Sequence, residues 1–208
     1  MKRSMTVTYI VEDKLYVNIT NRCSNACEFC IRNNGDGAYG SESLWLEREP
    51  TREEILDSIL SRDLTAFPEL VFCGYGEPSY RLDDAAYVAK EVKARHPEMK
   101  IRINTNGQSD LILGRRTAPD YAGAFDIVSI SLNRPTAAGY QQLCHSVYGE
   151  AAFDAIIRFA SEVKLYVPSV QLSAVRQTLT EEEIALCHSI CDRIGVTLRL
   201  RDYIPPEE

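Results

Sequence analysis

The sequence has no run of apolar residues that approaches the ~20 needed to cross a membrane as a helix. The start of the chain also lacks the pattern of a secretion signal, because Thr6, Thr8 and Glu12 interrupt the apolar residues that follow its early positive charges. We therefore expect a cytoplasmic protein with no membrane partner.

Positive charge is scarce as well. The chain has 23 Lys and Arg against 30 Asp and Glu, which gives a formal net charge of -7. Proteins that follow nucleic-acid phosphates need clustered Lys and Arg, so this balance argues against a nucleic-acid partner. No internal repeat or low-complexity tract is present. At 208 residues, we expect a single domain that spans residues 1–208.

Strand and helix patterns alternate along the chain, which is typical of parallel βαβ units. Thr51 with Glu54, and Thr180 with Glu183, form capping boxes that predict the starts of two helices. A first strand at residues 6–11 is expected to form a hairpin with the next. The chain is too short for the eight units of a full barrel, so we predict an α/β fold: an open, TIM-like (β/α)6 partial barrel with a parallel sheet and outer helices. The six expected barrel strands are at residues 14–20, 69–74, 100–105, 126–133, 168–176 and 196–204.

Three of the seven cysteines lie in one short stretch, "CSNACEFC", directly after the strand at residues 14–20. Without a secretion signal, such residues indicate thiolate, metal or buried roles rather than disulfides. A structural zinc site needs four ligands, and Cys73, Cys144 or a histidine would have to supply the fourth. In a 4Fe-4S cluster, Cys23, Cys27 and Cys30 would each hold one iron, and the fourth iron would stay open for a substrate.

This loop, with Phe29 before its third cysteine, resembles the Cys-x3-Cys-x2-Cys loop of the radical S-adenosylmethionine (radical SAM) superfamily. The likeness is greatest to the small family associated with TatD-type nucleases. It implies a partial barrel, a 4Fe-4S cluster held by Cys23, Cys27 and Cys30, and S-adenosylmethionine as the second cofactor. It also implies that the backbone near Phe29 contacts the adenine.

A glycine turn, "CGYGEP", follows the strand at residues 69–74. Gly74 and Gly76 would permit positive φ and a close approach to a ligand, and Glu77 before Pro78 would be presented at the rim of the site. The turn resembles the Gly-Gly-Glu-Pro motif of the superfamily, which receives the amino group of the methionine moiety. Tyr75 departs from the second glycine of that motif.

Polar residues also end the later strands, where parallel α/β folds place their chemistry. The resemblance implies that "INTNG", with Asn104, helps to hold the methionine or ribose part of the cofactor. In "SISLN", period-two alternation puts Ser131 and Asn133 on one face, where they would suit ribose hydroxyls or a carboxylate. Arg176 would reach the cofactor carboxylate or an anionic substrate, or else form a surface ion pair.

The function implied is that of a radical SAM enzyme. A 4Fe-4S cluster cleaves S-adenosylmethionine reductively, and the resulting 5′-deoxyadenosyl radical abstracts hydrogen from an unknown substrate. A one-electron donor, such as a flavodoxin or ferredoxin, would be the partner. The alternatives are a glycyl-radical activase that acts on a partner protein and a zinc or iron–sulfur binding module without turnover.

Two further features have competing interpretations. Cys187 and Cys191 lie four apart on a predicted helix, and we favour buried apolar roles over an auxiliary metal site. Residues 33–46 contain three glycines and the only tryptophan, Trp45. This segment is either a lid over the site or a loop whose tryptophan packs on the first helix near Ile55 and Ile59.

Overall fold

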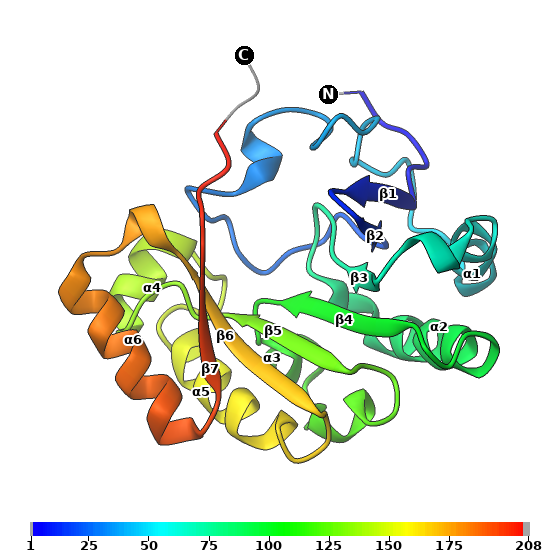
Figure 1. The fold of residues 1–208 in the computed structure, drawn as a ribbon. Coiled ribbons are helices and arrows are strands. Elements are labelled where there is room, and N and C mark those ends of the chain that lie inside the picture. Colours follow the sequence, from blue (N-terminus) through cyan, green and yellow to red (C-terminus); the bar gives the residue numbers. More distant parts are fainter. Residues whose placement is uncertain (1, 206–208) are drawn as a thin grey trace.

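The computed structural model describes residues 2–205, in which seven strands form one sheet in chain order. Strand β1 pairs antiparallel with β2, and all later neighbours are parallel (Figure 1). The predicted hairpin and parallel α/β sheet are thus confirmed. The strands are β1 Thr8–Val11, β2 Lys14–Val17, β3 Glu69–Phe72, β4 Lys100–Thr105, β5 Ile127–Ser131, β6 Ser169–Val175 and β7 Thr197–Arg201.

The helices begin where their capping residues predict. Thr51 and Thr180 each accept a hydrogen bond in a complete capping box, and the second of these helices ends at Gly195 with φ 79°. The α-helices are α1 Arg52–Leu60, α2 Leu82–Arg95, α3 Ser109–Leu113, α4 Ala137–Cys144, α5 Ala151–Val163 and α6 Glu181–Ile194. Short 3-10 turns are η1 Ile31–Asn33, η2 Leu64–Ala66, η3 Pro78–Arg81, η4 Ala118–Tyr121 and η5 Arg176–Thr178. Helix α4 was not predicted, although Thr136 caps it by accepting from the Gly139 amide.

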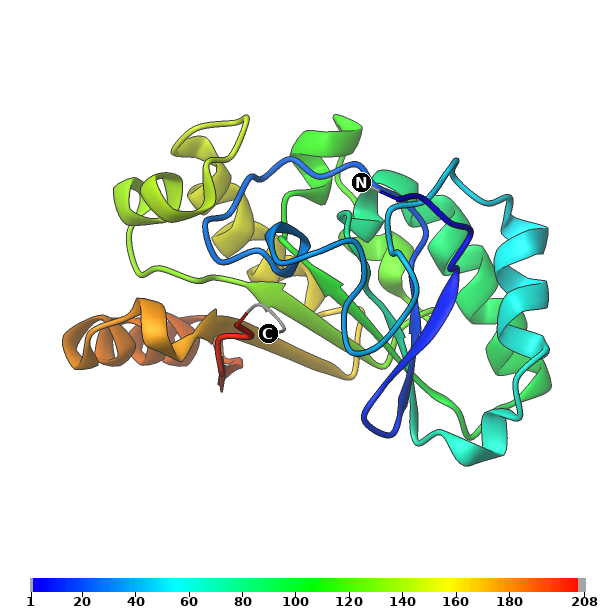
Figure 2. The ribbon, with the colours of Figure 1, turned by 90° about the horizontal axis from the view of Figure 1, so that it is seen from above.

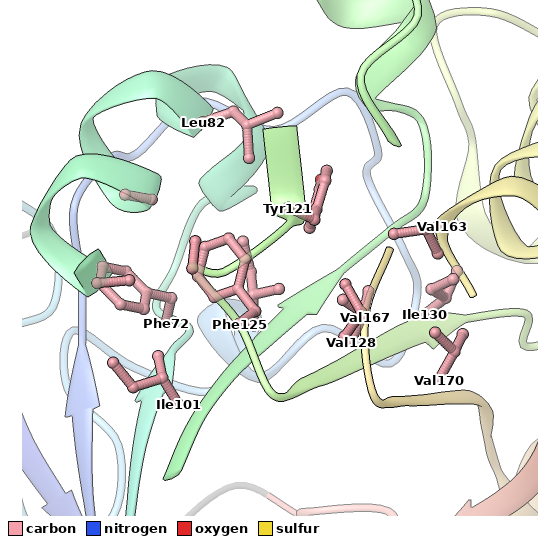
Figure 3. Packing of buried hydrophobic residues seen from close by; sticks show 14 of the residues in the cluster. Phe72, Leu82, Ile101, Tyr121, Phe125, Val128, Ile130, Val163, Val167 and Val170 are labelled. Atoms are coloured by element: carbon pink, nitrogen blue, oxygen red, sulfur yellow. The ribbon is translucent and has the colours of Figure 1, made fainter. Parts of the chain in front are cut away.

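The outer face of the sheet is apolar and packs on the helices. Phe72 from β3 meets Phe125 edge to face, with ring centroids 5.8 Å apart, and Val128 and Ile130 from β5 lie nearby (Figure 3). Burying this surface supplies most of the driving force for folding. Cys187 and Cys191 of α6 are buried in the same core, which confirms the apolar interpretation of this pair.

The inner face of the sheet is polar. Strand registers place Asn104 opposite Ser129, Ser129 opposite Gln171, and Ser173 opposite Arg199. Opposed residues in a ladder share a face, so these side chains line the concave side of the curved sheet, whose helices lie on its other side (Figure 2). The partial barrel therefore leaves a polar inner surface, and the carboxyl ends of its strands meet at one edge.

Residues 33–46 are held against the glycine turn by Tyr75. Tyr75 donates a hydrogen bond that its hydroxyl shares between the carbonyls of Gly35 and Gly37, at 3.0 and 2.7 Å. Trp45 packs edge to face on Tyr75, at 5.2 Å between ring centroids, in a small cluster separate from the main core. The prediction that Trp45 packs near Ile55 and Ile59 is therefore wrong, because its partner is the tyrosine that departs from the glycine motif. The role of this segment as a lid stays a prediction.

Candidate active site

The cysteine loop runs from the end of β2 to η1 above the ends of the central strands (Figure 1). Its backbone is joined to the segment at the end of α4: the Ala26 amide donates to the Cys144 carbonyl at 3.0 Å, and the Glu28 amide donates to the Leu143 carbonyl at 3.1 Å. The unpredicted helix α4 therefore supports the loop that carries the thiols.

A buried polar network fixes the loop from below. Ser24 donates to Gln108 at 2.9 Å, and Asn106 donates to Ser24 at 2.8 Å. Asn25 belongs to the same network: its side chain donates to the Tyr140 hydroxyl at 2.8 Å and accepts from Gln108 at 2.9 Å. These polar residues, which make the stretch a poor hydrophobic core, position the loop before any ligand binds, since buried polar groups are stable only when they are hydrogen-bonded.

The three thiols of the loop are half-buried and free of disulfides. Burial raises the pKa of Cys23 to about 12 and also raises that of Cys30. The neighbouring Cys144 thiol raises the pKa of Cys27, and Cys27 in turn lowers the pKa of Cys144. Cys144 accepts a hydrogen bond from Asn133 Nδ2 at 3.5 Å, so it supports Cys27 from behind.

This donor set fits an iron–sulfur cluster. Soft thiolates are the ligands that such clusters use, and one loop offers three of them, half-buried and free. Across residues 2–205, no three His, Cys, Asp or Glu side chains gather around a point where one metal ion would fit. Cys23, Cys27 and Cys30 would each hold one corner of the cluster, as the sequence predicts.

The glycine turn after β3 differs from its prediction. Neither Gly74 nor Gly76 has positive φ. An added Cβ would come within 2.1 Å of Asn18 Oδ1 at Gly74 and 2.3 Å of the Thr20 carbonyl oxygen at Gly76. The glycines thus let the turn pack against the start of the cysteine loop, and in the structure their close neighbour is protein backbone and an asparagine.

Glu77 is also placed differently from the prediction, since it is 4% exposed and does not lie at the rim. Its carboxylate accepts from the Ser79 amide at 3.0 Å, the Thr105 hydroxyl at 2.7 Å and the Asn106 amide at 2.6 Å. Burial raises the pKa of Glu77, while these donors act in the opposite direction. We call Glu77, Ser79, Thr105 and Asn106 the Glu77 cluster. It joins the turn that begins at the buried Pro78 to the end of β4.

Two predicted residues carry buried acceptors that no described residue satisfies. These are Asn104 Oδ1 at the end of β4 and Asn133 Oδ1 just after β5, where Asn133 has φ 57°. A buried unsatisfied acceptor is costly, so each marks a place where a ligand's N–H or O–H would be stabilised. S-adenosylmethionine has an ammonium group and ribose hydroxyls, and the two amides fit it. Ser131 lies between them along the inner face of β5.

Arg176 points elsewhere. It is exposed and pairs with Glu181 at 3.1 Å, as in the surface ion-pair alternative. The cation that does reach the site is Arg201 at the end of β7, whose guanidinium carbon lies 5.7 Å from the centroid of the Phe29 ring. The Asn34 side chain donates to the Ile204 carbonyl at 2.9 Å, which holds the end of β7 against the cysteine loop. The alternating pattern of β7 is the signal that could have identified Arg201.

Known proteins share this sequence pattern and fold. The chain is 29% identical over 170 residues to the "Tungsten-containing aldehyde ferredoxin oxidoreductase cofactor-modifying protein" of Pyrococcus furiosus, a match that covers 77% of this chain and 43% of that protein. The chain thus spans less than half the length of this relative.

Two solved structures have a similar fold. Streptococcus suis SuiB bound to S-adenosylmethionine has a TM-score of 0.63 at 16% identity, with 93% of this chain and 39% of that chain covered. Methylornithine synthase has a TM-score of 0.61 at 17% identity, with 92% and 53% covered. No helix among residues 2–205 is both long and apolar enough to cross a membrane.

The family model that matches this chain covers residues 17–189, from the end of β2 into α6, and so includes the cysteine loop, the glycine turn and the ends of β4 and β5. A match over most of the chain, to the same parts that build the site, shows the family. The chain therefore belongs to the radical SAM superfamily.

Proposed function

We propose that this chain is a radical SAM enzyme that abstracts hydrogen from its substrate. The observation that carries the proposal is one arrangement. Three half-buried thiols lie on the cysteine loop, which a hydrogen bond from Asn106 to Ser24 joins to the end of β4. At the ends of β4 and β5, Asn104 and Asn133 hold unsatisfied acceptors. The three thiols would hold a 4Fe-4S cluster, which would supply the one-electron reductive cleavage of S-adenosylmethionine.

The protein's own groups bind, orient and exclude water. Cys23, Cys27 and Cys30 would hold the cluster, and the amide oxygens of Asn104 and Asn133 would accept from the cofactor's donors. Phe29 would lie against the adenine, and Ser131 against a ribose hydroxyl. The glycine turn would orient the site without touching the cofactor, since it packs against the cysteine loop and is hydrogen-bonded to the end of β4. Its residues are Gly74, Gly76, Glu77 and Pro78.

Finer features belong to the same proposal. The resemblance of the cysteine loop supports a place near the TatD-associated family, and the single sheet within residues 2–205 supports one domain over residues 1–208. A low-potential cluster needs a one-electron donor, for which a flavodoxin or ferredoxin in the cytoplasm is suitable. The names of the relatives describe different reactions, so the proposal is stated at the level of the shared chemistry.

The test is anaerobic reconstitution with iron and sulfide, followed by dithionite and S-adenosylmethionine. We expect about four irons per chain and formation of 5′-deoxyadenosine, measured by liquid chromatography and mass spectrometry. Cys187→Ala, in the core away from the loop, is the matched control and should behave as the parent protein. One bound zinc, or four irons without any 5′-deoxyadenosine, would contradict the proposal.

A further inference from the structure

The inner face of the sheet carries an excess of positive charge in a chain whose net charge is -7. Following the registers from β3 to β7, its cationic positions are Lys100, Arg102, Arg199 and Arg201, and its acidic position is Glu69. Glu69 is already used, since it pairs with Arg102 at 3.0 Å and both side chains are buried. Toward the carboxyl edge, the cations of this face are therefore left without acids.

Arg201 is the cation nearest the cysteine loop. Its guanidinium contacts Phe29, and the thiols of Cys27 and Cys73 and the phenol of Tyr39 lie close enough to act on it electrostatically. Arg201 is partly exposed, and no described carboxylate lies within ion-pair distance of its side chain. A partly desolvated guanidinium is stabilised by a paired opposite charge or by hydrogen-bond acceptors, which a ligand can supply.

Arg199 lies one pleat deeper on the same face. It is opposite Ser173 in the register with β6, and it acts electrostatically on Tyr16 of β2, across the concave surface. It is exposed within the open half-barrel, and the described residues provide no ion-pair partner for it. We call Arg199 and Arg201 the arginine face.

We propose that the substrate carries a phosphate or carboxylate group that is bound by Arg199 and Arg201 on the inner face of the sheet. This inference rests on the proposed function and adds the chemical class of the substrate. Arginine presents five donors in a planar fork, which matches the oxygens of both groups. Two arginines on alternate residues of one strand point the same way, so a single anion can bridge them.

Arg199 lies farther from the cysteine loop than Arg201 does. An anion bound at Arg199 is therefore distinct from the charged groups of the cluster site. The thiolates of the cysteine loop can act as counter-ions for Arg201, because that residue contacts the loop through Phe29. Arg199 lies opposite Ser173 on the inner face of the sheet, which it shares with the polar side chain of Gln171. A ligand that uses both arginines therefore extends from the cluster into the barrel, which is the direction a substrate must occupy to meet a radical formed at the edge.

The experiment is calorimetric titration of the anaerobically reconstituted protein with two probes, pyrophosphate and succinate. We expect at least one probe to bind, with Arg201→Gln and Arg199→Gln each weakening it by tenfold or more. A preference for pyrophosphate assigns a phosphate group, and a preference for succinate assigns a carboxylate. Arg193→Gln is the matched control, because Arg193 is an exposed arginine in the last turn of α6 on the outer side.

Three results would overturn the inference. In the first, neither probe binds; in the second, both arginine variants bind the probes as the parent protein does. The third concerns the cofactor. S-adenosylmethionine affinity is measured in parallel by equilibrium dialysis: an equal loss of cofactor and probe binding in Arg199→Gln would assign the cations to the cofactor instead. Arg199 is exposed, so its variant keeps the test valid if Arg201→Gln fails to fold. Formation of 5′-deoxyadenosine by a protein that binds neither probe rejects the anion site and leaves the proposed function intact.

Discussion

Two regions of the site, the Glu77 cluster and the arginine face, differ in how fully their charges are satisfied. Glu77 is buried and accepts from three donors within the protein. Arg199 and Arg201 have no acidic partner among residues 2–205. A charge satisfied inside the protein stabilises a fold, whereas a charge left unpaired toward an open face is available to a ligand. The comparison separates groups that shape the site from groups that would bind in it.

The cysteine loop contacts both regions. Removing one of its thiols should change the protein more than any other substitution considered, because cluster binding would be lost. Cys27→Ala should abolish the charge-transfer absorbance of the reconstituted 4Fe-4S cluster, because each thiolate of the loop holds its own iron. Iron content and visible absorbance measure this, with Cys187→Ala and Cys191→Ala as controls. If Cys27→Ala retains four irons, the neighbouring Cys144 is the first replacement ligand to examine.

In the Glu77 cluster, Glu77→Gln should lower the free energy of unfolding by ~2–3 kcal/mol. The amide would place an NH₂ group against an N–H or O–H donor that now faces the carboxylate, and hydrogen bonds to charged groups contribute about 1.5–3 kcal/mol. Urea unfolding of the reduced apoprotein measures the change. Glu181→Gln, at an exposed carboxylate of a surface pair, is the control. If Glu77→Gln and Glu181→Gln have the same free energy of unfolding, the Glu77 cluster does not stabilise the fold.

Tyr75→Phe should lower the free energy of unfolding by ~1 kcal/mol, because it removes the hydroxyl group that bonds two backbone carbonyls. The change should release residues 33–46 from the glycine turn and alter the emission of Trp45, which packs on this ring. Unfolding and fluorescence are measured on the same samples. An unchanged emission with full loss of stability would mean that the segment is held by its other contacts, such as the hydrogen bond from Asn18 to the Leu44 carbonyl.

The smallest effect is expected at Arg176. Its ion pair with Glu181 is exposed, and such pairs contribute about 0–1 kcal/mol. Arg176→Gln should therefore leave both the unfolding free energy and S-adenosylmethionine affinity nearly unchanged. A large loss of cofactor affinity would restore the sequence-based assignment of Arg176 to the cofactor site, beside Arg201.

Local signals account for most of what could be predicted. The capping boxes at Thr51 and Thr180 place two helix starts correctly, since the cap and its partner are three residues apart in sequence. Helix α4 was missed because its Thr136 cap lacks the acidic residue that completes such a box. The sequence does not decide whether the Arg176 side chain points into the site or to the surface. A strand pattern does not show whether the residue after the strand turns outward, as Arg176 does at the start of η5.

By itself, the sequence determined the chemistry of this protein: three thiols at fixed spacing on one loop, a parallel sheet, and polar residues where its strands end. Those features depend on neighbours in the chain, and period-two alternation or a capping box is visible in a single segment. Only the tertiary structure decided which groups satisfy one another. Glu77 meets the Asn106 amide, Cys27 meets Cys144, and Arg201 meets Phe29, each across many residues of chain. Burial removes water as the alternative partner, so the fold sets which charges are paired and which remain for a ligand.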